Sequence, residues 1–164
     1  MLPLHPRLVH LPIALAVLMP LVTSGLLLAW WRGWLPRRAW VVAVVLQGAL
    51  VVGGIAAIRS GEGDEKRAQT VVTEAQLEEH EDAGKALTGA GLVVLALAAA
   101  GLLVKAEGAG RAAAAAAVAG SLVVLLLAWR AGELGGRLVY VHGGASAWRP
   151  VPGAAMPAPA RQGE

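Results

Sequence analysis

The sequence contains no cysteine, no phenylalanine and a single tyrosine. The lack of cysteine excludes disulfides, cysteine-ligated iron–sulfur clusters, thiolate zinc sites and the Cys-x-x-Cys-His attachment of c-type haem. Charge is scarce too, at 15% of the 164 residues, against about a quarter in soluble domains. The hydrophobic class makes up 57%, with a mean hydropathy of +0.62. This composition is typical of a membrane protein, and the length suits one domain.

Several functional motifs are also missing from the sequence. It has no Lys/Arg-rich run with interleaved aromatic residues, so the net charge of +3 does not indicate nucleic-acid binding. No phosphate-binding loop or Ser-His-Asp pattern is present, and the stretch around His80 lacks the second histidine of a His-Glu-x-x-His metalloprotease. We therefore favour a binding or electron-transfer protein over an enzyme.

Four apolar stretches can each cross about 30 Å of hydrocarbon, which takes roughly 20 helical residues. They cover residues 11–31, 39–58, 86–104 and 112–129. Backbone polar groups inside a bilayer must be satisfied within the segment, so each stretch should be a helix. The sequence thus predicts an all-α, polytopic membrane protein, a four-helix transmembrane bundle in residues 1–148. Residues 149–164, rich in proline and alanine, are predicted to be a disordered tail.

The longest connection, residues 59–85, is polar and acidic. Within it, Thr73 followed three residues later by Gln76 has the pattern of a helix-capping box. This pattern predicts a helix over residues 73–85 that runs directly into the third span.

Two short connections are basic, one between the first and second spans and one between the third and fourth, and both lie on the side away from the acidic loop. They carry Arg32, Arg37, Arg38, Lys105 and Arg111. More Lys and Arg residues lie on the opposite side, but the positive-inside rule weighs short loops most. It therefore predicts cytoplasmic short loops, with the acidic loop and both termini outside.

The chain has four histidines, and an even number of predicted spans separates them, so all four should lie at one membrane face. Imidazole is the commonest metal ligand in proteins and also ligates haem iron. A one-sided set of histidines therefore indicates a metal or haem site. We expect His10, His80 and His142 as the main ligands, with His5 as the fourth.

His80 has the best physical argument. On a helix it shares a face with Gly84, one turn away. Because glycine has no side chain, Gly84 would leave a slot beside the imidazole for a flat macrocycle. A neighbouring acidic residue such as Glu81 could orient the imidazole. The alternative is an interfacial histidine hydrogen-bonded to such a glutamate, with Gly84 present for helix packing.

His142 follows an apolar segment, residues 138–141. The pair Gly135 and Gly136 predicts the end of the fourth helix, after which this segment could fold back and bring His142 to the other histidines. The alternative is a flexible, exposed loop.

His5 and His10 both lie at the start of the first span, but only one of them can face a shared site. On one helix they would point about 140° apart, because each residue turns 100°, so both cannot face one partner. Pro6 also disfavours a helical conformation for His5. These arguments rank His10 above His5.

The motifs at both ends of the chain are distinctive. It opens with His-Pro-Arg-Leu-Val-His-Leu-Pro-Ile-Ala-Leu from His5 and closes with Gly-Gly-Arg-Leu-Val-Tyr-Val-His-Gly from Gly135. With His80 before the third span, they resemble the bacterial domain-of-unknown-function 2231 family over nearly the whole chain up to Trp148. The departure at Leu11, where the family usually has phenylalanine, is conservative.

The resemblance implies a four-helix membrane protein without an assigned activity. Some family members are fused to Rieske-type or cytochrome-type electron carriers, and the plan is similar to that of two-haem b-type cytochromes. Together with the histidines, this predicts a haem b protein of the bacterial inner (cytoplasmic) membrane, embedded in the lipid bilayer, with a Rieske-type or cytochrome redox partner. The first alternative is a Cu, Zn or Fe module for sensing or transport. The second is a structural subunit of a respiratory assembly whose histidines only form hydrogen bonds.

Overall fold

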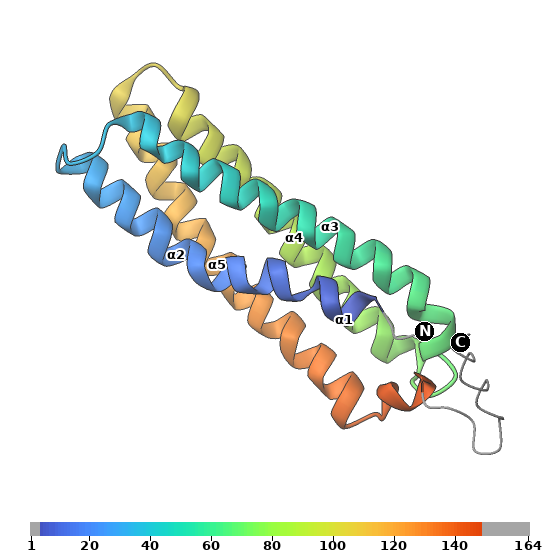
Figure 1. Cartoon of the computed structure of the whole chain (residues 1–164). Helices are drawn as coiled ribbons and strands as arrows, with labels where there is room; N and C mark the ends of the chain where they lie inside the picture. The colour runs from blue at the N-terminus through green and yellow to red at the C-terminus, as the bar shows by residue number, and fades with distance from the viewer. Residues whose placement is uncertain (1–3, 149–164) are drawn as a thin grey trace, which may run out of the picture.

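The computed structural model describes residues 4–148, which form long helices running side by side along one axis (Figure 1). In chain order the elements are α1 (His5–Leu8), α2 (His10–Trp31), the 3-10 helix η1 (Arg37–Trp40), α3 (Val41–Ala68), α4 (Glu74–Leu103), α5 (Glu107–Tyr140) and the 3-10 helix η2 (Gly144–Trp148). No strand occurs within this described range. The tail predicted at residues 149–164 lies outside it.

Four helical segments are long and apolar enough to cross a membrane: α1 with α2, η1 with α3, α4 and α5. The outward faces of the bundle are apolar as well, with Leu21, Val52 and Trp129 between 67% and 77% exposed. Apolar surface on this scale is unfavourable in water but suits contact with lipid. The predicted all-α, four-helix transmembrane fold is confirmed.

Small residues bring the helices close together. Alanines from four of the helices are completely buried, namely Ala16, Ala43, Ala98, Ala114 and Ala117. A Cβ atom added at Gly101 of α4 would come within 3.0 Å of the Trp40 indole nitrogen and 3.3 Å of the Ala114 backbone nitrogen. Without a hydrophobic driving force between helices in lipid, such close van der Waals packing drives association.

Buried polar side chains also link neighbouring helices. The Trp40 indole donates a hydrogen bond of 2.9 Å to the Ala98 carbonyl, and the Gln47 amide donates one of 2.9 Å to the Gly91 carbonyl. Both donors are at most 1% exposed. Each bond satisfies a polar group that lipid could not, so these two contacts fix how η1 and α3 sit against α4.

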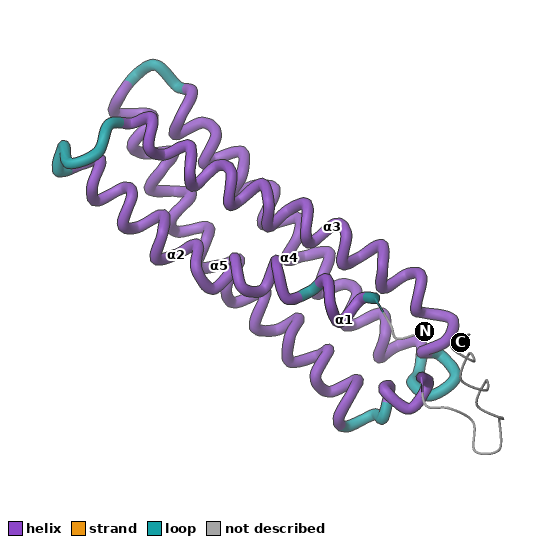
Figure 2. Tube along the Cα trace, viewed as in Figure 1, coloured by secondary structure: helices purple, strands orange, loops and turns teal. Residues whose placement is uncertain are grey.

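The helices extend well beyond the apolar stretches. Helix α3 continues to Ala68, so the connection to α4 shrinks from the predicted polar loop to residues 69–73 (Figure 2). Helix α4 follows directly, and its start is the predicted capping box: the Thr73 hydroxyl accepts from the Gln76 backbone N–H, while Gln76 Oε1 accepts from the Thr73 backbone N–H. That prediction is confirmed.

The predicted end of the last helix at the glycine pair is wrong. Helix α5 runs through Gly135 and Gly136 to Tyr140, and the chain turns only at Gly143, whose φ is +71°. A glycine inside a helix is less favourable than alanine by only about 1 kcal/mol, which the packing of α5 against α4 can offset. The segment 138–141 is therefore mostly helix and does not fold back as a separate strand-like piece.

The fold makes a prediction about helix packing. Gly101→Val should lower the free energy of unfolding by about 1–3 kcal/mol, because the added atoms would overlap the Trp40 ring and the α5 backbone. Gly89→Val, on the same helix, is the matched control, since nothing lies within 4 Å of a Cβ at Gly89. Thermal unfolding in detergent, followed by circular dichroism, compares the two. Equal midpoints would contradict the packing argument.

Candidate functional site

The start of α4, the ends of α3 and α5, and the N-terminal segment gather at one end of the bundle (Figure 1). Three of the predicted ligands lie on these segments: His5 begins α1, His80 is in the second turn of α4, and His142 follows α5. His10 is the first residue of α2 and is exposed. The antiparallel helices thus carry the histidines towards the same end.

His5 and His80 form a pair. Their ring centroids lie 5.9 Å apart and the ring planes are nearly perpendicular, at 89°. His5 belongs to α1, with Pro6 in the first turn, where the missing N–H of proline leaves no hydrogen bond unmade. The expectation that Pro6 keeps His5 out of a helix is therefore wrong. Of the two N-terminal histidines, His5 faces the bundle.

Helix α3 holds the His5 ring in a defined orientation. His5 Nδ1 lies 2.8 Å from the Ala57 carbonyl oxygen and 3.3 Å from Ser60 Oγ. A carbonyl can only accept, so Nδ1 carries the hydrogen of this bond and Nε2 is the unprotonated nitrogen of the neutral ring. Gly61 permits the approach, since a Cβ there would be 3.3 Å from His5 Nδ1. Histidines that bind metals commonly have such a backbone-bonded second nitrogen.

Helix α5 covers the other ring of the pair. Gly135 lies against His80, and a Cβ added there would be 3.0 Å from His80 Cε1. The glycine predicted to make room, Gly84, instead has open space around it. His80 Nδ1 is buried without a hydrogen-bond partner among residues 4–148, which leaves a nitrogen lone pair or hydrogen unused.

Electrostatics favour a neutral His80. It lies in the polar first part of α4, before the apolar stretch that starts at residue 86. Burial lowers the pKa of His80, as does the neighbouring charge of His5 when protonated, while the Ala131 backbone carbonyl opposes both. A neutral imidazole is the form that binds metal ions and haem iron.

His142 is engaged elsewhere, at the start of α4. Gln76 Nε2 donates a hydrogen bond of 3.0 Å to His142 Nδ1. The orientation of the Gln76 amide is fixed, because its oxygen already accepts from Thr73 N–H at 3.0 Å. Gln76 Nε2 also lies 3.4 Å from His142 Nε2, so one ring nitrogen of His142 must be the acceptor, and the shorter distance favours Nδ1. One glutamine thus caps α4 and anchors the segment after α5.

The four predicted ligands do not form one cluster. Within the described part of the chain, no three His, Asp or Glu side chains converge on a point that could hold a metal ion. The structure brings His5 and His80 together, bonds His142 to Gln76, and leaves His10 exposed. Which of these histidines bind a cofactor stays a prediction.

Sequence reasoning missed three residues that shape the pair: Ser60 and Gly61 of α3, and the packing role of Gly135. Ser60 and Gly61 follow the second apolar stretch, in a segment whose composition resembles a loop. The available signal was spacing, because Ala57 and Gly61 are four apart and share one face if the helix continues.

The geometry defines a four-helix integral membrane protein with a histidine pair at one end. Its sequence matches the family described as "Predicted membrane protein (DUF2231)" over residues 1–147. The match covers most of the chain, so this protein belongs to that family, as its end motifs indicated. No curated protein and no solved structure matches it.

The double role of Gln76 can be separated by substitution. Gln76→Glu keeps an oxygen for Thr73 N–H but cannot donate to His142, whereas Gln76→Ala loses both bonds. We expect hydrogen exchange at residues 141–146 to speed up in both variants. Exchange at the start of α4 should rise only in Gln76→Ala, by about fivefold for a cap of about 1 kcal/mol. Peptide-resolved exchange mass spectrometry would measure this, and unchanged exchange at 141–146 in both variants would contradict the anchor.

Proposed function

We propose that this protein binds b-type haem and transfers electrons in the membrane, and that His5 and His80 would hold the haem iron. The ring separation of 5.9 Å is the observation that carries the proposal. Two imidazole nitrogens about 2.0 Å from one metal place their ring centroids roughly 5 Å apart when they bind at a tetrahedral angle and roughly 6.3 Å apart when they bind on opposite sides. The pair is therefore spaced to share a single metal centre.

The number of protein ligands favours haem over a bare ion. A structural zinc site takes about four protein ligands, and the described residues converge in a pair instead. A porphyrin supplies four nitrogens itself, so haem iron needs only one or two axial side chains. A bis-histidine set matches that requirement.

The surroundings of the two histidines fit a role in holding the iron. The bond to the Ala57 carbonyl fixes which nitrogen of His5 is free, and the buried Nδ1 of His80 has an unused bonding capacity. Haem would supply reversible one-electron chemistry when bound. Helices α3 and α5 would fix the positions of the two imidazoles, because Gly61 and Gly135 allow those helices to approach the rings.

Location and partner follow from the same proposal. The basic loops lie at the opposite end from the histidine pair, which supports a histidine end on the outer side of a bacterial inner membrane. Both termini would then also be outside. A Rieske-type or cytochrome-type carrier is the expected redox partner, because some members of the family resemble fusions to such carriers.

One observation favours a second candidate, a Cu, Zn or Fe ion bound without porphyrin. The two ring centroids lie 5.9 Å apart with nearly perpendicular planes, so a single ion could bridge two of their nitrogens, with water or a third side chain completing the shell. Such a site would serve metal sensing or transport.

The first test is the spectrum of the purified full chain, expressed with ample haem. We expect a Soret band and a sharp reduced α-band, lost by more than tenfold in His5→Ala and His80→Ala because each removes a ligand of the haem iron. His10→Ala is the matched control and should keep its haem. Colourless protein with stoichiometric metal by elemental analysis would favour the bare ion. Colourless, metal-free protein would refute both candidates.

The second test perturbs the His80 ring without removing it. Gly135→Val should lower haem per protein severalfold, because its Cβ would stand 3.0 Å from His80 Cε1. Gly136→Val is the control, since a Cβ there meets nothing within 4 Å. The pyridine haemochrome assay on folded, monodisperse samples gives the ratio. Equal haem content in the two variants would refute His80 as a ligand.

A further inference from the structure

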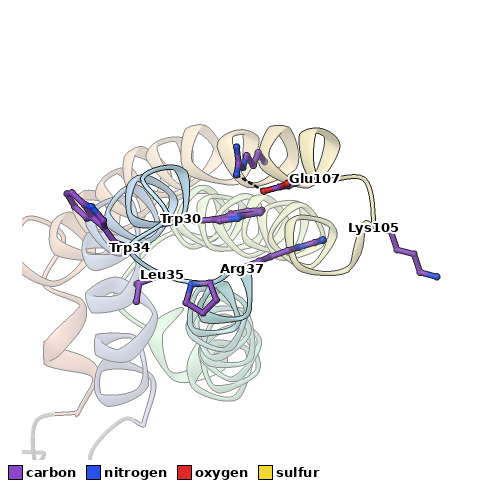
Figure 3. A pocket seen from close by; sticks show the side chains of 9 residues that line it. Trp30, Trp34, Leu35, Arg37, Lys105 and Glu107 are labelled. Atoms are coloured by element: carbon purple, nitrogen blue, oxygen red, sulfur yellow. Dashed lines mark hydrogen bonds and ion pairs between the residues drawn. The ribbon is translucent and has the colours of Figure 1, made fainter.

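The opposite end of the bundle contains a cavity of about 630 Å³ between the α2–η1 connection and the start of α5 (Figure 3). Its lining includes two tryptophans, three basic residues and one acid, which are Trp30, Trp34, Arg37, Lys105, Arg111 and Glu107. With three cations against one carboxylate, the lining has a net charge of +2. A cavity with this balance attracts an anion.

Two guanidinium groups share one indole. Arg37 Cζ lies 5.8 Å and Arg111 Cζ 5.7 Å from the Trp30 ring centroid. Cation–π attraction holds each group at the ring, and it also holds two like charges in one small region. Figure 3 shows Trp30 between Glu107 and Arg37, with Lys105 extending outward at the rim.

The two arginines differ in the hydrogen-bond donors that remain available for a ligand. Arg37 is committed to the end of α4, donating from Nε to the Gly101 carbonyl at 3.1 Å and from Nη2 to the Val104 carbonyl. Arg111 Nη2 pairs with Glu107 at 2.5 Å, but its Nε is buried without a partner among the described residues. A buried donor without a hydrogen-bond partner is unfavourable, and the Arg111 side chain as a whole is 38% exposed, so the guanidinium can still receive a further acceptor.

We propose that this cavity binds the phosphate group of an anionic phospholipid. Phosphate oxygens would accept from the Arg111 guanidinium, with Lys105 and the Arg37 charge adding attraction. The position favours lipid as the source: Trp31 and Trp34, 56% and 68% exposed, stand at the end of a membrane-spanning helix as interfacial tryptophans do. Basic pockets between transmembrane helices are known binding places for anionic headgroups.

The test is lipid binding to the full chain in detergent, measured by native mass spectrometry with phosphatidylglycerol and with zwitterionic phosphatidylcholine. We expect selective binding of phosphatidylglycerol. Arg111→Gln should weaken it about fivefold, the effect of one basic residue near an anionic headgroup. Glu107→Gln should strengthen it by a similar factor, because it removes the competing carboxylate.

Arg130→Gln is the matched control, since Arg130 belongs to the histidine end and its side chain is 66% exposed. It should leave the affinity unchanged. Equal affinity in wild type, Arg111→Gln and Glu107→Gln would overturn the site. If Arg111→Gln does not fold, the comparison of wild type with Glu107→Gln still tests the proposal. Inorganic phosphate that binds as tightly as the lipid, and responds to the same substitutions, would overturn the lipid assignment.

Discussion

The contact between α4 and α5 sets the position of almost everything else in this molecule. Three pairs of residues mark it from one end of the bundle to the other: Gly101 against Ala114, Val94 against Gly120, and His80 against Gly135. In each pair a residue with little or no side chain lets a larger group or a backbone approach. Because close packing is what holds helices together in lipid, the small residues deep in the membrane fix the antiparallel register. That register then places Gly135 opposite His80, outside the apolar stretch of α4.

The register has a periodic basis in the sequence. Counting in sevens along α4 gives His80, Leu87, Val94 and Gly101, and along α5 it gives Ala114, Ser121, Ala128 and Gly135. Apart from the two residues at the histidine end, every one of these is buried. A seven-residue repeat keeps one seam of a helix facing its partner, as in left-handed helical bundles. His80 and Gly135 are the polar end of this seam.

The sequence was sufficient for the spans and insufficient for the helix ends. Hydropathy locates the four crossings because lipid leaves the backbone only the helical solution. It says little about where a helix stops in water, so α3 runs ten residues past the predicted boundary at 58, to Ala68. The capping box at Thr73 was visible because it is a local hydrogen-bond pattern. The glycine pair at 135 misled because the same residue type ends helices and also permits close contacts within them.

The ranking of His10 above His5 was limited in the same way, because the sequence does not show where the helices end. His5 could not be placed from the sequence, because its neighbours Ala57 and Gly61 belong to a helix that is distant in the chain and extends beyond the apolar stretch. Conversely, Gly84 looked important because it is local to His80, yet it faces open space. Local spacing identifies which residues share a face, and only the packing of two helices decides which face is opposed. For this bundle the seven-residue seam carries that information, so a search for histidines and glycines on facing heptad positions would have found the pair of His80 and Gly135 directly.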